Sequence, residues 1–120
     1  MIHEEICTYE VCKLAKEKGF DVPTHYAYNE NRQKAMYMEL CLNRNTKDSH
    51  SISAPTQSLP QRWLREKKGL HITVPFDNNE FWWQIKNLAN GDSEYGEALG
   101  FDTYELALED ALKYALENLV

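Results

Sequence analysis

The sequence contains few of the residues that cross-link a small fold. Its 120 residues include three cysteines, Cys7, Cys12 and Cys41, and no CxxC pair. An odd number of thiols without that spacing argues against a disulfide framework and against a structural zinc site. We therefore predict three reduced thiols that are mostly buried, because free cysteine is among the most buried residue types.

Long apolar runs are absent as well. No stretch of the roughly 18 apolar residues that a transmembrane helix needs occurs in the chain. The first residues, MIHEEICTYE, are acidic and lack the apolar segment of a signal peptide. These absences predict a cytoplasmic protein. The length favours one domain over residues 1–120, and three Trp, seven Tyr and four Phe predict a packed core.

Recognisable catalytic motifs are missing too. The chain has no G-x-S-x-G, Walker loop, H-E-x-x-H or G-x-G-x-x-G. Its four histidines are scattered, and none has a second histidine at the spacing of a metal site. We predict no catalytic residue, no cofactor and no metal ion. A small enzyme without a known motif remains the third alternative for function.

The charge is distributed very unevenly along the chain. The formal net charge of −6 divides into −3 for residues 1–30, +5 for residues 31–72 and −8 for residues 73–120. Such asymmetry can indicate a charged partner, or it can let the parts of the fold attract one another.

Three segments have the pattern of amphipathic helices. The first begins at its N-cap Thr8 and ends at Gly19, with Phe20 packing back on it. The second, SLPQRWLREKK, begins at Ser58 with an S-x-x-Q capping box, or alternatively at Thr56. The third follows Thr103 and runs to the end of the chain. Its predicted buried stripe comprises Tyr104, Leu108, Ala111, Leu112, Ala115 and Leu119.

Two pairs of strands separate these helices. Residues 24–28 and 35–42 form the first predicted hairpin, and residues 70–76 and 80–88 form the second around the turn Asp-Asn-Asn. Residues 43–53 and 89–100 are predicted loops. The order α-ββ-α-ββ-α predicts an α+β two-layer sandwich, with one antiparallel sheet and the helices mainly on one face. Residues 25–68 and 71–118 suggest a duplicated ββα unit.

The adjacent pair Trp82-Trp83 is the most informative feature of the second hairpin. Neighbouring strand residues point to opposite faces, so Trp83 is predicted in the core and Trp82 on the second face. That face is either covered by the first helix and the long loops or open to a partner. The candidate interaction surface consists of Trp82, Tyr37, His71 and Lys86.

The helix from Ser58 to Lys68 is the most basic segment of the chain. Its candidate anion-binding residues are Arg62, Arg65, Lys67 and Lys68. They spread around most of the helix instead of forming one stripe, and the two lysines also suit the negative C-terminal end of a helix. We therefore favour a solvated helix face anchored by Leu59 and Trp63 over an anion-binding surface.

Two of these helices resemble a group of short uncharacterised phage and prophage proteins. The resemblance lies in the motif APTxxxxxxWLRE, here residues 54–66, before an apolar hairpin, and in TYExAxxxALK, here residues 103–113. It implies a phage-type origin and no known activity, ligand or catalytic residue.

The residues thus favour a non-catalytic protein-interaction or self-associating module, because aromatic residues are enriched in interface cores. The alternative is a nucleic-acid-binding accessory protein that uses the basic helix and an aromatic sheet face. The net negative charge weighs against that alternative, since phosphate contacts usually dominate affinity.

Overall fold

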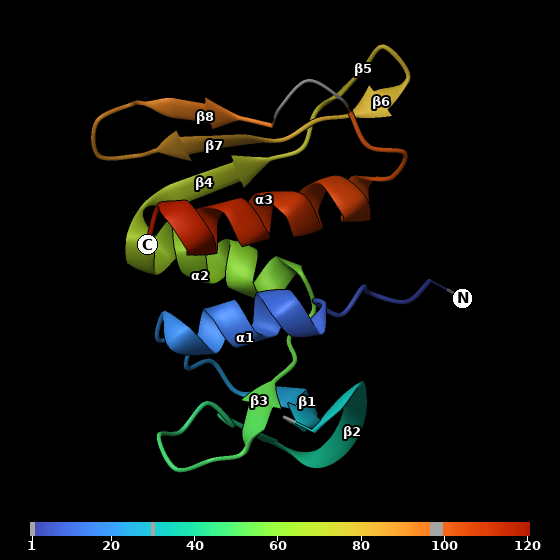
Figure 1. Cartoon of the computed structure of the whole chain (residues 1–120). Helices are drawn as coiled ribbons and strands as arrows, with labels where there is room; N and C mark the ends of the chain where they lie inside the picture. Colours follow the sequence, from blue (N-terminus) through green and yellow to red (C-terminus); the bar gives the residue numbers. More distant parts are fainter. Residues whose placement is uncertain (1, 30, 97–99) are drawn as a thin grey trace. The chain divides into compact units, whose positions relative to one another are not determined.

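The computed structural model describes residues 2–29, 31–96 and 100–120 (Figure 1). The α+β class is confirmed, since helices and antiparallel strands account for most of the described residues. In chain order the elements are α1 (Tyr9–Glu17), β1 (Thr24–Asn29), β2 (Arg32–Leu42), β3 (Ser51–Ser53), α2 (Ser58–Lys68), β4 (Leu70–Thr73), β5 (Phe76–Asp77), β6 (Glu80–Phe81), β7 (Gln84–Asn87), β8 (Ser93–Tyr95) and α3 (Tyr104–Asn118).

The chain divides into two compact units, residues 1–60 and 61–120. The expectation of one domain over residues 1–120 stays a prediction. The expectation of one sheet is wrong, because the described strands form three separate sheets, ordered β2-β1-β3, β4-β7-β8 and β5-β6. Each of the three is antiparallel.

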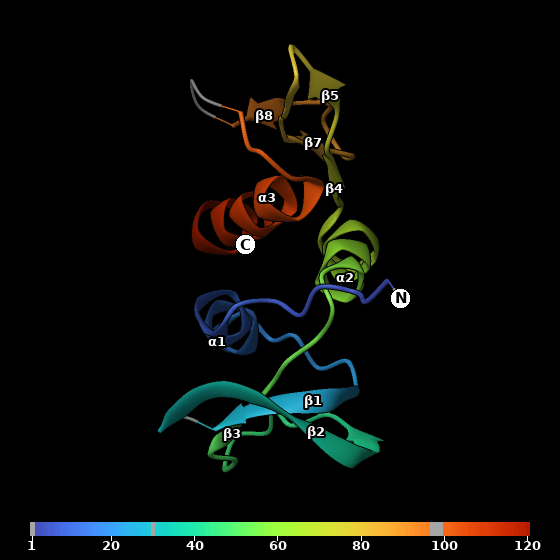
Figure 2. The same cartoon turned by 90° about the vertical axis from the view of Figure 1, so that its right-hand side faces the viewer.

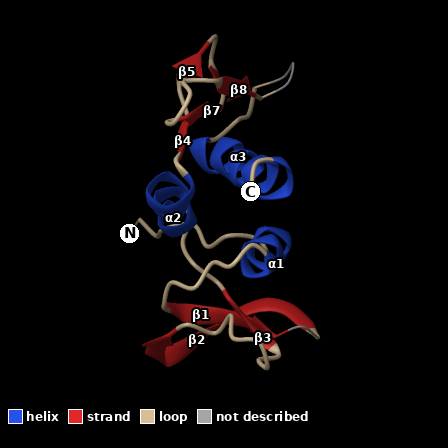
Figure 3. Cartoon of the chain, turned by 90° about the vertical axis from the view of Figure 1, so that its left-hand side faces the viewer, coloured by secondary structure: helices blue, strands red, loops and turns tan. Residues whose placement is uncertain are grey.

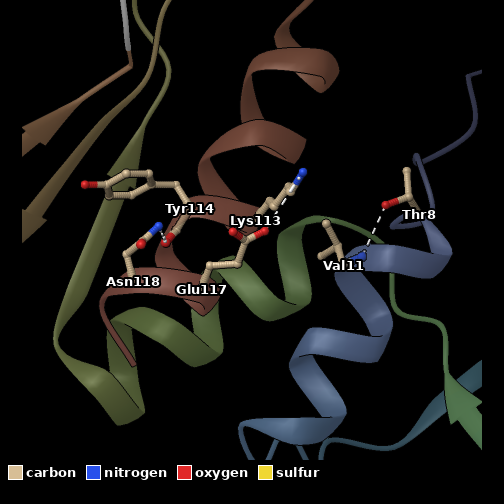
Figure 4. Close-up of polar contacts among 6 residues, drawn as sticks. All are labelled: Thr8, Val11, Lys113, Tyr114, Glu117 and Asn118. Carbon is tan, nitrogen blue, oxygen red and sulfur yellow. Dashed lines mark hydrogen bonds and ion pairs between the residues drawn. The ribbon is translucent and has the colours of Figure 1, made fainter.

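The first helix begins and ends as its sequence predicts. The Thr8 hydroxyl accepts a hydrogen bond from the Val11 N–H at 3.3 Å (Figure 4). At the other end Gly19 has a φ of 92°, and Phe20 N–H donates to the Ala15 carbonyl at 2.9 Å. This is the Schellman pattern, and it returns the buried Phe20 ring to the helix.

In the first unit, β1 is the central strand and pairs with β2 on one side and β3 on the other. Helix α1 lies against one face of this sheet (Figures 2 and 3). The Tyr9 ring meets the Tyr28 ring edge-on at 5.6 Å, and Tyr28 is the register partner of Ile52. The predicted loop 43–53 was wrong at β3, whose sequence Ser-Ile-Ser is too short and polar to show a strand pattern.

The thiols of the first unit follow the prediction in part. Cys7 and Cys12 are buried, and Cys41 is exposed on β2; each of the three is a thiol and not half of a disulfide. The N-terminal segment is tied to the residues before α2, because Cys7 N–H donates to the Pro55 carbonyl and Gln57 N–H to the Glu5 carbonyl, both at 2.9 Å.

In the second unit, α3 packs on the sheet β4-β7-β8. Thr103 caps α3 as predicted, accepting from Leu106 N–H at 3.1 Å. The predicted buried stripe is correct in its centre and wrong at its ends, where Tyr104 is exposed and Leu119 half-buried. The buried residues of α3 are Ala107, Leu108, Ala111, Leu112, Ala115 and Leu116. The Tyr104 ring meets the Phe81 ring edge-on at 6.2 Å but stays exposed, and Leu119 lines a small cleft with Leu70 and Ile85.

The second hairpin forms, but it is interrupted. β4 pairs with β7 and β5 with β6, while residues 74–75 and 82–83 lie outside these strands. Its turn contains Asn78 and Asn79 at φ values of 52° and 61°, which asparagine tolerates better than most residues. The predicted alternation assumed one continuous strand. Trp82 and Trp83 instead lie in a break between β6 and β7. The second predicted loop was also wrong at β8, which adds a third strand beside β7.

The two three-stranded sheets differ in strand order. In the sheet β2-β1-β3, the central strand β1 is the first of the three in the sequence. In the sheet β4-β7-β8, the central strand β7 is the second of the three. A duplicated ββα unit would keep equivalent strands in equivalent positions, so this difference argues against the suggested repeat.

Candidate interaction surfaces

Strand β2 is the most exposed apolar element among the described residues. It lies at the edge of its sheet and pairs with β1 on one side only. From residue 34 to residue 42 no side chain is buried. Its large apolar side chains have exposed fractions of 66% for Leu40, 61% for Tyr37, 51% for Met36 and 47% for Leu42. The Leu40 carbonyl already accepts from the Arg44 side chain at 2.7 Å, but a sheet edge that carries apolar side chains is still a template for strand addition.

Tyr37 is held in place by neighbouring rings on β1. Its ring is 5.4 Å from that of Tyr26 and stacks on that of His25 at 5.8 Å, with an interplanar angle of 10°. The His25 Nδ1 atom lies 3.2 Å from the Met38 carbonyl oxygen. The exposed Tyr37 ring is therefore ordered before any partner binds, which lowers the entropic cost of binding.

The structure brings together only part of the surface predicted around Trp82. His71 and Lys86 are register partners in the β4–β7 pair, so their side chains share one face of that sheet. Trp82 precedes β7 in the break of the hairpin, where its indole N–H donates to the Asp77 carbonyl at 3.0 Å. Tyr37 belongs to the other three-stranded sheet.

The sheet face that carries His71 is polar. By register, Gln84 and Tyr95 lie on it, and the Gln84 amide is within hydrogen-bond distance of Ser93 Oγ (3.3 Å) and of the Tyr95 hydroxyl (3.4 Å). The His71 Nδ1 atom is buried without a hydrogen-bond partner among the described residues. This face is less apolar than β2 and resembles an ordinary solvated sheet surface.

Trp83 lies inside the second unit, as predicted. Only 3% of its surface is exposed. Its indole N–H donates to the Asp110 carboxylate at 2.8 Å, and its ring packs on that of Tyr114 at 5.1 Å. The side chains of α3 thus fix both the orientation and the depth of this ring. The polar contacts of α3 at Lys113, Tyr114 and Asn118 appear in Figure 4.

The basic residues of α2 are not assembled into one site. Arg62 forms an ion pair of 3.1 Å with Glu66 of the same helix, and Lys68 lies over the Trp63 ring at 5.4 Å. Arg65 is half-buried and Lys67 is exposed. Trp63 itself is buried, which agrees with its predicted role as an anchor. Two of the four cations therefore have partners on their own helix.

A cleft in the first unit was not predicted from the sequence. It has a volume of about 660 Å³ and lies beside α1, and its lining residues are Tyr9, Lys13, Lys16, Glu17, Asn31 and Ile52. The sequence feature that could have indicated this cleft is the pair Lys13 and Lys16, three residues apart on α1. The opposite wall includes Ile52 of β3, a strand that was not predicted from the sequence.

Comparison with known proteins gives no relative for this chain: no family model, no curated protein and no solved structure matches it. Across the described ranges, none of the helices has the length and apolar character needed to cross a bilayer. Within the same ranges, no three or more His, Cys, Asp or Glu side chains gather in a way that could hold a metal ion.

Proposed function

We propose that this protein is a non-catalytic self-associating module, in which β2 pairs antiparallel with β2 of a second copy. The observation that carries the proposal is the exposed edge of β2, eleven residues long and apolar in its second half except for Glu39. At about 3.4 Å per residue, the strand spans more than 30 Å, and its pairing with β1 shifts register twice, between residues 32 and 36 and between residues 37 and 42. Natural proteins usually protect edges of this kind by charge, proline or a covering element.

A second copy is the occupant that suits this strand best. Two identical antiparallel strands are related by a two-fold axis perpendicular to the sheet, so each face continues into the same face of the partner. Met36 and Leu40 would therefore extend an apolar surface across both copies. In-register parallel pairing would place Lys34 beside Lys34 and Glu39 beside Glu39, a like-charge contact that antiparallel pairing centred on Tyr37 avoids.

Sedimentation velocity over a concentration series tests this proposal. We expect the wild-type chain to shift from monomer toward dimer as its concentration rises. Leu40→Lys should weaken the dimer about tenfold or more, because it places a charge at the centre of an apolar contact. Leu88→Lys is the matched control, since it makes the same substitution at an exposed leucine of the second unit, which is 54% exposed.

Two results would contradict the proposal. One is a wild-type chain that stays monomeric up to millimolar concentration. The other is an equal effect of Leu40→Lys and Leu88→Lys, which would mean that the charge acts through solubility and not through β2. A circular-dichroism melt of both variants shows whether either one has lost its fold.

The resemblance of residues 54–66 and 103–113 to phage proteins supports a phage-type origin as part of this proposal. The nucleic-acid alternative has weaker support in the structure. The aromatic sheet face does not form as predicted, because Tyr37 and Trp82 do not share a sheet. Arg62 already pairs with Glu66, which reduces the charge that α2 can offer to phosphate groups.

A further inference from the structure

We infer that the cleft beside α1 binds a small organic anion, a phosphate or carboxylate that carries an aromatic ring. The cleft lies wholly within residues 1–60 and involves neither β2 nor self-association. Its volume of about 660 Å³ falls within the range of about 300–1,000 Å³ that is usual for small-molecule sites.

One part of the cleft is apolar and rigid. Ile52 is buried at the centre of β3, where it pairs with Tyr28. Tyr9 packs edge-on against the Tyr28 ring at 5.6 Å, which fixes the orientation of the Tyr9 ring. A preformed wall of one aromatic ring and one branched aliphatic side chain suits a flat apolar group.

The other part of the cleft carries a fixed positive charge. Lys16 Nζ donates to the carbonyl oxygens of Ser49 and Ser51, both at 2.9 Å, so its ammonium group is held at the cleft. A lysine ammonium has three N–H donors, and these two bonds use two of them. The third remains for a ligand, and the two carbonyl dipoles leave the formal charge of the ammonium uncompensated.

Lys13 adds a second cation at the same cleft. It lies three residues before Lys16 on α1, a spacing that places both side chains on one side of the helix. Glu17 is the only carboxylate among the described lining residues, so these carry a net formal charge of +1. Asn31 supplies a neutral amide. Two ammonium groups beside an aromatic wall match an anion with an attached ring.

Phenyl phosphate and benzoate are suitable probes, and benzyl alcohol is the uncharged control. We expect both anions to shift the backbone amide resonances of Lys13, Lys16 and Ile52 in a saturable way, and benzyl alcohol to bind more weakly. Lys13→Gln should weaken phenyl phosphate binding about fivefold, as expected for a partly exposed charged contact. Lys47→Gln, a change of an exposed loop lysine outside the cleft, should leave it unchanged.

Lys16→Met provides a second variant, and its melting curve shows whether the loop it holds is still folded. The inference is overturned if saturating anion shifts none of the three resonances. It is also overturned if benzyl alcohol binds as tightly as phenyl phosphate, or if Lys13→Gln and Lys47→Gln weaken binding equally. Inorganic phosphate shows whether the aromatic ring contributes: binding as tight as that of phenyl phosphate would refute the ring-recognition part of the inference.

Discussion

Replacing Trp83 by alanine should destabilise the protein by about 3–5 kcal/mol, as for other buried large aromatic residues. The structure gives the reason. The ring is 97% removed from solvent, packs on Tyr114 and donates to Asp110. A tryptophan side chain buries about 150–250 Å², which corresponds to about 4–6 kcal/mol at roughly 25 cal/mol per Å². This range is an upper estimate, because the unfolded chain already buries part of the ring, and it overlaps the about 3–5 kcal/mol that is typical of such substitutions.

The polar part of that cost should be small. Asp110 is exposed, so water can replace the lost indole N–H, and the carboxylate does not become a buried unpaired charge. Trp83→Phe keeps an aromatic ring and loses the donor, and we expect it to cost about 1–2 kcal/mol. The difference between the two variants therefore measures the ring's packing separately from its hydrogen bond.

Urea unfolding followed by circular dichroism is the appropriate measurement, because both variants remove a fluorescent tryptophan. Trp82→Ala is the matched control. It removes the same residue type one position earlier, from a half-buried place where the indole N–H bonds to the Asp77 carbonyl. We expect this control to cost about 1–2 kcal/mol. Equal losses of the free energy of unfolding for Trp82→Ala and Trp83→Ala would refute the assignment of Trp83 alone to the core.

Two further outcomes are expected. Trp63→Ala should lower the free energy of unfolding by about 3 kcal/mol or more, because only 6% of this residue is exposed. A thermal melt measures this loss, with Arg62→Ala as the control. Equal melting temperatures for the two variants would show that Trp63 does not anchor α2. Gel shifts with single- and double-stranded DNA and RNA at about 50 mM salt should show no binding. Binding that weakens steeply as the salt concentration rises, and that the double variant Arg65→Gln/Lys67→Gln abolishes, would instead favour the nucleic-acid function.

Part of the candidate surfaces was predictable from the sequence. Trp63 was correctly assigned to the interior from its apolar spacing on a helix, which is a local pattern. Trp83 was also correctly assigned, but it lies in a break of the hairpin and not in the alternating strand from which its side was inferred. His71 and Lys86 were correctly predicted to share a sheet face, because register within a hairpin follows from its turn. Tyr37 was wrongly placed in the same sheet as Trp82, since nothing in a local pattern states which hairpins share a sheet.

The sequence by itself determined the α+β class, the ends of α1 and the N-cap of α3. These depend on contacts within a few residues: Thr8 and Thr103 bond to N–H groups three positions later, and Gly19 adopts the positive φ that ends a helix. Tertiary structure alone decided that β2 is an edge, that β3 and β8 exist, and that α1 and β3 enclose a cleft. Edges and clefts arise from pairing between distant segments, and short polar strands form only because a neighbouring strand supplies their hydrogen bonds.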